Sequence, residues 1–76
     1  MNLGAKIREI RVNQGITQQH VVRKMDKYPS WLSEIEAGNT RLLADDLGEL
    51  ADALNVAIVD FFLPENIAKS EVGKGA

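Results

Sequence analysis

The sequence is poor in several kinds of residue, and each shortage excludes a class of structure or function. Its 76 residues include no cysteine, which excludes a disulfide framework and any cysteine-based metal site. One Trp, one Tyr and two Phe are too few to fill a core, so Leu, Ile and Val must build it. Neither a signal peptide nor an apolar run of about 18 residues occurs. We therefore expect one soluble, cytoplasmic domain with no membrane partner.

Catalysis has little support in this composition. The only histidine is His20, and no Gly-rich phosphate loop, HExxH motif or Ser/His/Asp spacing occurs. We expect His20 to be a solvated surface side chain. A group of acids late in the chain is more simply the solvated face of a helix than a metal cluster: Asp45, Asp46, Glu49 and Asp52. The sequence therefore predicts no enzyme, no metal site and no cofactor.

Charge is unevenly distributed along the chain. The formal net charge is −2, which by itself disfavours a polyanionic partner. Residues 1–41 nevertheless carry +3, from seven Lys and Arg against four acids, whereas residues 42–76 carry −5, from two Lys against seven acids. A basic region can still face phosphate, because charges act mainly within a Debye length of about 10 Å. Segregation of this size also arises by chance, so charge alone does not assign a partner.

Apolar residues at helical spacing predict an all-α fold with five helices and no strand. The expected helices are 3–13 after an Asn2 cap, 18–25 after a Thr17 cap, 28–36 with Pro29 in its first turn, a fourth with Asp45 and Asp46 in its first turn, and 57–63. Gly48 lies inside the fourth helix, where it either allows a close approach or is merely tolerated. Residues 1–64 are expected to form the domain and residues 65–76 a flexible tail.

The stretch 17–38 says most about function. It predicts two short helices joined near Asp26, a residue that tolerates a left-handed backbone. On the second helix, Leu32 and Ile35 form a narrow apolar edge for the core. The remaining side chains can hydrogen-bond or make flat contacts outward, which suits insertion into a DNA major groove: Tyr28, Ser30, Trp31, Ser33 and Glu34. Two alternatives stay open for Trp31, which either lies on this reading face or folds back onto the domain.

Several short motifs follow one another in a characteristic order. They are Ile7-Arg8-x-x-Arg11, Gly15-Ile16-Thr17-Gln18, Val21, Leu32-Ser33-x-Ile35-Glu36-x-Gly38, Leu50-Ala51-x-x-Leu54-Asn55-Val56 and Ile58-x-x-Phe61-Phe62. In this order and spacing, residues 4–63 resemble the Cro/phage-repressor type of helix-turn-helix domain, often called the XRE family. The chain departs from the family at Asp26, where glycine is usual, and at Val22, where a small residue is usual. The resemblance implies a compact five-helix lambda-repressor-like domain of a DNA-binding transcriptional regulator, expected to be a repressor.

The resemblance also implies roles for individual residues. Glu34 can accept a hydrogen bond from a cytosine amino group, and the full base-reading set is Tyr28, Pro29, Ser30, Trp31 and Glu34. Gln18 matches the family's phosphate-anchoring glutamine, and the ends of the reading helix offer further phosphate contacts from Lys27, Asn39 and Arg41. A largely buried ion pair is expected between Arg11 and Glu36, the alternative being two independently solvated charges.

The expected partner is double-stranded DNA. Members of the family usually act as homodimers on palindromic sites, and helix 57–63 carries more apolar surface than one short helix can bury. We expect Phe62 or Leu63 to form the dimer interface. Two alternatives remain in the same class, an antitoxin and the controller protein of a restriction–modification system. A third alternative is a protein-interaction module, in which Trp31 and the acidic half of the chain bind a protein partner.

Overall fold

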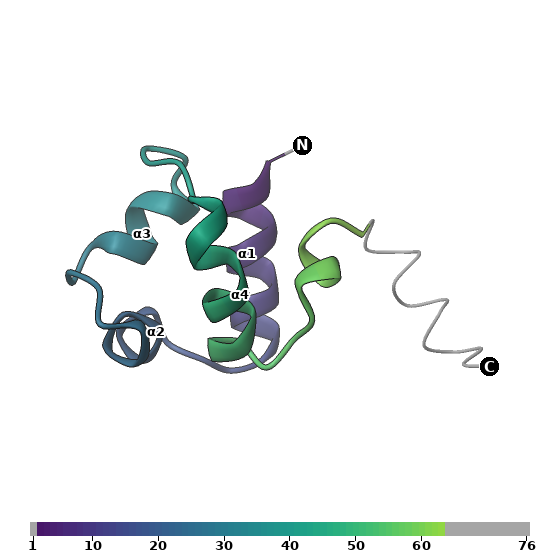
Figure 1. The fold of residues 1–76 in the computed structure, drawn as a ribbon, viewed down its shortest axis with the longest axis horizontal. Coiled ribbons are helices and arrows are strands. Elements are labelled where there is room, and N and C mark those ends of the chain that lie inside the picture. The colour runs from purple at the N-terminus through teal and green to yellow at the C-terminus, as the bar shows by residue number, and fades with distance from the viewer. Residues whose placement is uncertain (1, 64–76) are drawn as a thin grey trace.

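Residues 2–63 are described by the computed structural model, and over this range the regular secondary structure is entirely helical. The elements are α1 (Leu3–Asn13), α2 (Gln18–Met25), α3 (Trp31–Glu36), α4 (Ala44–Ala53) and the 3-10 turn η1 (Ile58–Phe61). In Figure 1, α1 and α4 lie across the middle, with α2 and α3 on one side and η1 on the other. The predicted all-α fold is confirmed, with a single 3-10 turn in place of the fifth helix. The tail predicted at 65–76 lies outside the described residues.

The helix ends are capped by the residues that the sequence indicated. The Asn2 side chain accepts a hydrogen bond from the Ala5 N–H at 3.0 Å, and the Thr17 hydroxyl accepts one from the His20 N–H at 3.1 Å. Each cap satisfies a backbone donor that has no partner within its helix. Asp26 adopts φ 59°, the left-handed conformation that the turn between α2 and α3 requires. Asp26 therefore adopts here the backbone conformation that glycine adopts most readily.

The core receives side chains from every element. Its fully buried members are Ile7, Val21, Leu32, Leu50, Leu54 and Phe61. Val22, where the family prefers a smaller residue, is also buried. No helix within residues 2–63 has both the length and the apolarity needed to cross a bilayer.

Two glycines show how closely the helices approach one another. A Cβ at Gly4 would lie 2.3 Å from the backbone oxygen of Ile35, so α1 can rest on the end of α3 only because this position lacks a side chain. A Cβ at Gly48 would meet only the flexible Cδ1 of Ile58, at an ordinary 3.7 Å. Of the two alternatives for Gly48, tolerance is therefore the one that the structure favours.

The start of α3 differs from the prediction. The helix begins at Trp31 instead of Tyr28, and Pro29 lies in the turn that precedes it. Within that turn, the Trp31 N–H donates to the Tyr28 carbonyl at 3.0 Å. The physical reason is Pro29 itself, because the ring of a proline disfavours the helical conformation in the residue before it. This accounts for Tyr28 lying outside the helix, with Ser30 as the residue that precedes its first turn.

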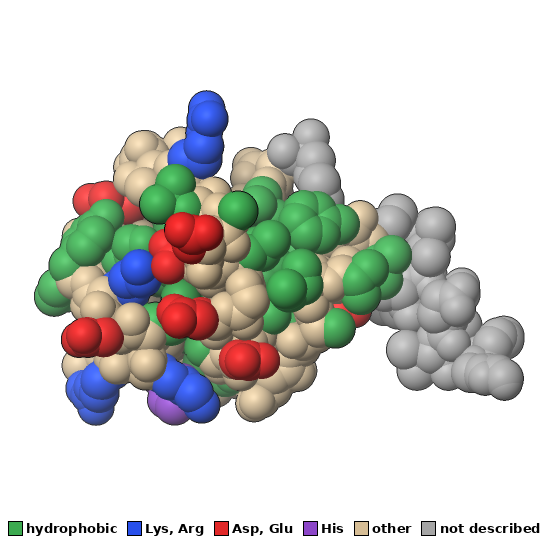
Figure 2. Space-filling model, in the orientation of Figure 1, with side chains coloured by type: hydrophobic (Ala, Val, Ile, Leu, Met, Phe, Trp, Pro, Cys, Tyr) green, Lys and Arg blue, Asp and Glu red, His purple; other side chains and the backbone are tan. Residues whose placement is uncertain are grey.

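Apolar side chains remain exposed over α4 and η1. Figure 2 shows a continuous apolar surface running from α4 across to η1. The exposed large apolar residues at these two elements are Leu43 at the start of α4 and Ile58, Val59 and Phe62 at η1. Phe61 is fully buried, whereas Phe62 is 48% exposed and Leu63 is partly buried. The two adjacent phenylalanines thus have opposite roles, one in the core and one on the surface.

Candidate nucleic-acid interface

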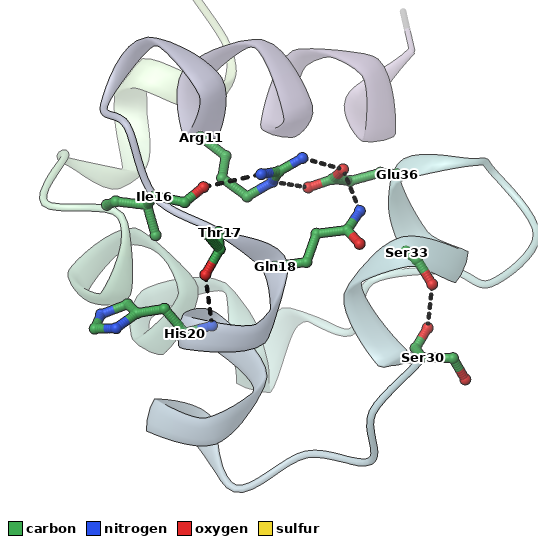
Figure 3. A network of polar contacts seen from close by, with 8 residues as sticks. All are labelled: Arg11, Ile16, Thr17, Gln18, His20, Ser30, Ser33 and Glu36. Carbon is green, nitrogen blue, oxygen red and sulfur yellow. Dashed lines mark hydrogen bonds and ion pairs between the residues drawn. The ribbon is translucent and has the colours of Figure 1, made fainter.

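The inner side of α3 is fixed to α1 by a charged network around Glu36 (Figure 3). Arg11 donates from Nε to Glu36 Oε2 at 2.7 Å and from Nη2 to Oε1 at 3.1 Å. Its Nη1 donates to the carbonyl of Ile16, just before α2, at 2.9 Å. The Glu36 side chain is 3% exposed. The predicted ion pair is therefore present, and one guanidinium joins α1, the start of α2 and the end of α3.

Gln18, the first residue of α2, belongs to the same network. Its side-chain nitrogen donates to Glu36 Oε1 at 2.9 Å, and Figure 3 shows the side chain lying between α2 and α3. This bond uses one of the two amide hydrogens, so a second hydrogen remains for another acceptor. The amide of Gln18 is thus held in a defined orientation at the start of α2.

The outer side of α3 is organised around a second carboxylate, that of Glu34. It accepts hydrogen bonds from the hydroxyls of Tyr28 at 3.3 Å, Ser30 at 3.4 Å and Thr40 at 3.2 Å. Tyr28 and Ser30 come from the turn before α3, and Thr40 comes from the loop after it. Glu34 therefore ties together the two segments that flank the helix.

The pKa of the Tyr28 hydroxyl is affected by its surroundings, which include Glu34. Desolvation raises the pKa of Tyr28 above its ordinary value of 10.0, and the charge of Glu34 and the hydrogen bond to it raise the pKa further. The cation of Lys27 acts in the opposite direction. The neutral phenol is consequently the favoured form, and as such it can donate to Glu34.

Trp31 is folded back onto the domain. It is only 6% exposed, and the Nζ of Lys27 lies 5.2 Å from the centre of its ring. The same Nζ forms an ion pair with Asp46 of α4 at 3.0 Å. Of the two alternatives for Trp31, packing against the domain is therefore the one observed. The indole ring presents no face outward that could contact a base. Lys27, expected to contact phosphate, is already paired with an acid.

The other predicted contact residues surround α3. Tyr28, Pro29 and Ser30 are exposed in the turn before it, and Asn39 and Arg41 are exposed in the loop after it. Two further hydroxyls on this surface are absent from the predicted base-reading set, those of Ser33 and Thr40. The Ser33 hydroxyl donates to the Ser30 carbonyl at 3.0 Å. Thr40 follows two residues after Gly38, which has a φ of 83°, and no sequence pattern indicates its contact with Glu34.

Metal-binding side chains do not gather anywhere in the described range 2–63, where no three His, Asp or Glu residues come close enough to hold an ion. The acids of α4 instead lie along its surface. Asp46 faces Lys27, and Glu49 and Asp52 border a shallow hollow that also touches Lys24.

Two short helices joined by a tight turn, the second held along one side and polar along the other, define a helix-turn-helix. The family described as "Helix-turn-helix domain" matches residues 2–60, and the chain belongs to that family. This agrees with the resemblance to the Cro/phage-repressor type. No curated protein matches the chain.

Solved structures of similar fold come from two bacterial sources. The clp gene regulator ClgR from Corynebacterium glutamicum is 28% identical in one crystal structure, covering 80% of this chain and 79% of that chain with a TM-score of 0.75. A second ClgR structure is 26% identical, covering 97% and 77% with a TM-score of 0.76. The hypothetical transcription factor NHTF from Neisseria is 25% identical, covering 90% and 78% with a TM-score of 0.76.

Proposed function

We propose that the protein is a sequence-specific DNA-binding transcriptional regulator that inserts α3 into the major groove of double-stranded DNA. The observation that carries this proposal is the two-sidedness of α3. Its inner side is buried through Trp31, Leu32 and Ile35, while Ser30 and Glu34 remain accessible on the outer side. A helix held in this way presents polar side chains to base edges while the domain keeps it rigid. The printed names of the similar structures, a gene regulator and a hypothetical transcription factor, support the same function.

The contacts are divided between bases and phosphates. Base contacts are proposed for Tyr28, Pro29, Ser30 and Glu34; Pro29 has no N–H and is suited only to apolar contact, such as a thymine methyl group. Phosphate contacts are proposed for Gln18, Asn39 and Arg41. Lys27 would contribute less, because it already pairs with Asp46. Repression is the proposed outcome, since occupying an operator requires no surface beyond the one that binds it.

Selection of binding sites from random duplex DNA, with the full chain, tests this function. The recovered duplex is then titrated at several salt concentrations, and we expect affinity to fall steeply with salt because phosphate contacts release counterions. Arg41→Gln should reduce the slope of log affinity against log salt by about 0.9 for each half-site bound, the value of one phosphate contact. Lys24→Gln is the matched control, because Lys24 borders the acids of α4 and its loss should leave the slope unchanged. Failure to enrich any sequence would refute the proposal.

A homodimer on a palindromic operator is the second part of the proposal. One domain of this size contacts about one half-site, and two-fold dimers place their reading helices about one turn of DNA apart. The apolar surface over α4 and η1, with Phe62 exposed and Leu63 partly so, supports an interface there. Residues of this kind are exposed at a cost in solvation that a second copy would remove.

Sedimentation equilibrium at micromolar concentration, with and without the selected duplex, tests the dimer. Phe62→Ser should shift the protein toward monomer. Val12→Ser is the matched control, since Val12 is also an exposed apolar residue but lies on α1. A wild-type monomer under both conditions would remove the dimer from the proposal and leave the reading of DNA by α3 intact.

An antitoxin or the controller protein of a restriction–modification system would contain the same domain. Either protein would give the same results in these experiments. The identity of the neighbouring genes distinguishes them. The protein-interaction alternative rested on an outward Trp31 and on the acidic half of the chain. It loses the first of these two supports because Trp31 is buried against the domain.

A further inference from the structure

The outer side of α3 carries four hydroxyl groups within residues 28–40, and all four donate inward. Three of them donate to the carboxylate of Glu34, from Tyr28, Ser30 and Thr40. The fourth, from Ser33, donates to the backbone carbonyl of Ser30. A hydroxyl has one hydrogen and two lone pairs, so each of these groups has only acceptor capacity left for an outside partner.

The remaining groups at the centre of this surface have the same character. Glu34 is an acceptor in its ionised form, and Pro29 has no N–H to offer. The backbone amide of Trp31 is committed to the Tyr28 carbonyl, and that of Asn39 to the Glu34 carbonyl at 2.9 Å. Side-chain donors lie at the margin, in Asn39 and Arg41 and in the second amide hydrogen of Gln18. The side chains in the middle of the reading surface therefore accept hydrogen bonds and do not donate them outward.

Base edges in the major groove differ in what they offer to such a surface. Guanine presents two acceptors, thymine presents one acceptor and a methyl group, and adenine presents a donor beside an acceptor. Cytosine alone presents a donor, its N4 amino group, without an acceptor on the same base. A carboxylate facing guanine or the adenine N7 would place acceptor against acceptor, which costs free energy because neither group is satisfied.

We propose that Glu34 and the hydroxyls that hold it, those of Tyr28, Ser30 and Thr40, form a set of side-chain acceptors that selects a cytosine in each half-site. This inference rests on the proposed function and names the base that the reading helix recognises. The hydroxyls are positioning residues. They connect the carboxylate to the segments before and after α3, so that its oxygens cannot rotate freely to meet a different base.

Chemical removal of the cytosine amino group tests the inference directly. In the selected duplex, each conserved cytosine is replaced in turn by pyrimidin-2-one, which lacks only the N4 amino group. For one position in each half-site, wild-type affinity should fall about tenfold, the value of one good base contact. Glu34→Ala should bind the two duplexes equally, because the group that read the amino hydrogen is gone. Glu34→Gln should shift the preference at that position from cytosine to adenine, which matches the mixed donor and acceptor of an amide.

The positioning role has its own readout. Thr40→Val and Tyr28→Phe remove one hydroxyl each and should reduce the ratio of affinities for the cytosine and pyrimidin-2-one duplexes several-fold. Circular dichroism confirms that both variants remain helical. Lys24→Gln should keep the wild-type ratio, since it lies away from α3.

The outcomes separate the inference from the function on which it rests. Specific duplex binding that is indifferent to every N4 amino group, or a pyrimidin-2-one penalty that survives in Glu34→Ala, would overturn the cytosine inference alone. Unchanged ratios in both Thr40→Val and Tyr28→Phe would overturn the positioning role. Absence of salt-dependent duplex binding by the wild-type chain would overturn both the proposed function and the inference.

Discussion

Two carboxylates stand two residues apart on α3, and their surroundings are opposite. Glu36 is almost fully buried and receives a guanidinium from Arg11 and an amide from Gln18. Glu34 is partly exposed and receives three neutral hydroxyls. The first set of partners supplies a compensating charge, and the second supplies only orientation.

The difference follows from solvation. A carboxylate removed from water must be paired with a cation, because the loss of hydration is otherwise not recovered. A carboxylate that water still reaches needs no such partner and can exchange its solvent for a ligand at modest cost. We therefore assign Glu36 to holding α3 in place and Glu34 to what α3 contacts, and each prediction below tests one side of that assignment.

The largest effect is expected from breaking the buried pair. Glu36→Ala should lower the free energy of unfolding by about 3–5 kcal/mol, because the guanidinium of Arg11 loses its counter-charge in a site that is nearly closed to water. Urea denaturation followed by circular dichroism measures the change. A cost for Glu36→Ala as small as that of an ordinary surface substitution would contradict the assignment.

A double-mutant cycle with Arg11→Met separates the pair from its surroundings. Because removing both charges leaves no unpaired ion, the double variant should be more stable than the sum of the two single losses predicts. Additive losses would mean that Arg11 and Glu36 act independently, whatever their distance.

The next effect concerns the carbonyl end of α3, on the same inner side. Gly4→Ala should cost about 1–3 kcal/mol, since its Cβ would meet the backbone oxygen of Ile35 and α1 would have to move away. Gly48→Ala is the matched control within a helix. Its Cβ meets only a flexible side-chain atom, so it should gain up to about 1 kcal/mol from helix propensity. Equal effects at the two glycines would show that the close approach of α1 to α3 is not a constraint.

The inner side of α3 was largely readable from the sequence. Leu32 and Ile35 stand three residues apart and predicted the buried edge, and the family resemblance supplied the Arg11–Glu36 pair. The buried position of Trp31 also has a signal in the sequence, because Trp31 stands four residues before Ile35 and so shares its side of the helix. The helix begins three residues after the predicted Tyr28, and the conformation that Pro29 imposes on Tyr28 keeps that residue outside it.

The outer side was not readable in the same way. Nothing in the spacing places Thr40 next to Glu34, since their contact depends on the path of the chain beyond Gly38. The fifth helix also shortened to the 3-10 turn η1, where the Asp60 carboxylate accepts from the Ala57 N–H at 3.0 Å. Local sequence patterns therefore predict which side of each element is apolar. Contacts between loops can be seen only in the folded structure.

A smaller effect on stability is expected on the outer side. Glu34→Ala should change the free energy of unfolding by at most about 1 kcal/mol, because its partners are hydroxyls that water can satisfy instead. The same denaturation experiment measures it. Glu34→Ala and Glu36→Ala can be compared directly, since each variant removes one carboxylate from the same helix. A loss at Glu34 equal to that at Glu36 would assign both carboxylates to stability.

The smallest effect is a shift in one titration. Tyr28 is the only tyrosine, so ultraviolet absorbance follows its ionisation alone. Its pKa is raised above 10.0 by desolvation and by Glu34, so the midpoint in the folded protein should lie above that value. Glu34→Gln should lower the midpoint toward 10.0 without restoring it fully, because the desolvation remains.

The sign of the linked stability effect follows from proton binding. Between the unfolded pKa of about 10 and the raised folded pKa, the folded state holds the phenolic proton that the unfolded state has lost, so stability falls as the pH rises through this window. Tyr28→Phe removes the titrating group and should flatten that part of the pH profile. A wild-type midpoint at or below 10.0 would mean that the Tyr28 hydroxyl does not donate to Glu34 in solution. Only Ser30 and Thr40 would then orient the carboxylate of Glu34, in contrast to the charged network around Glu36.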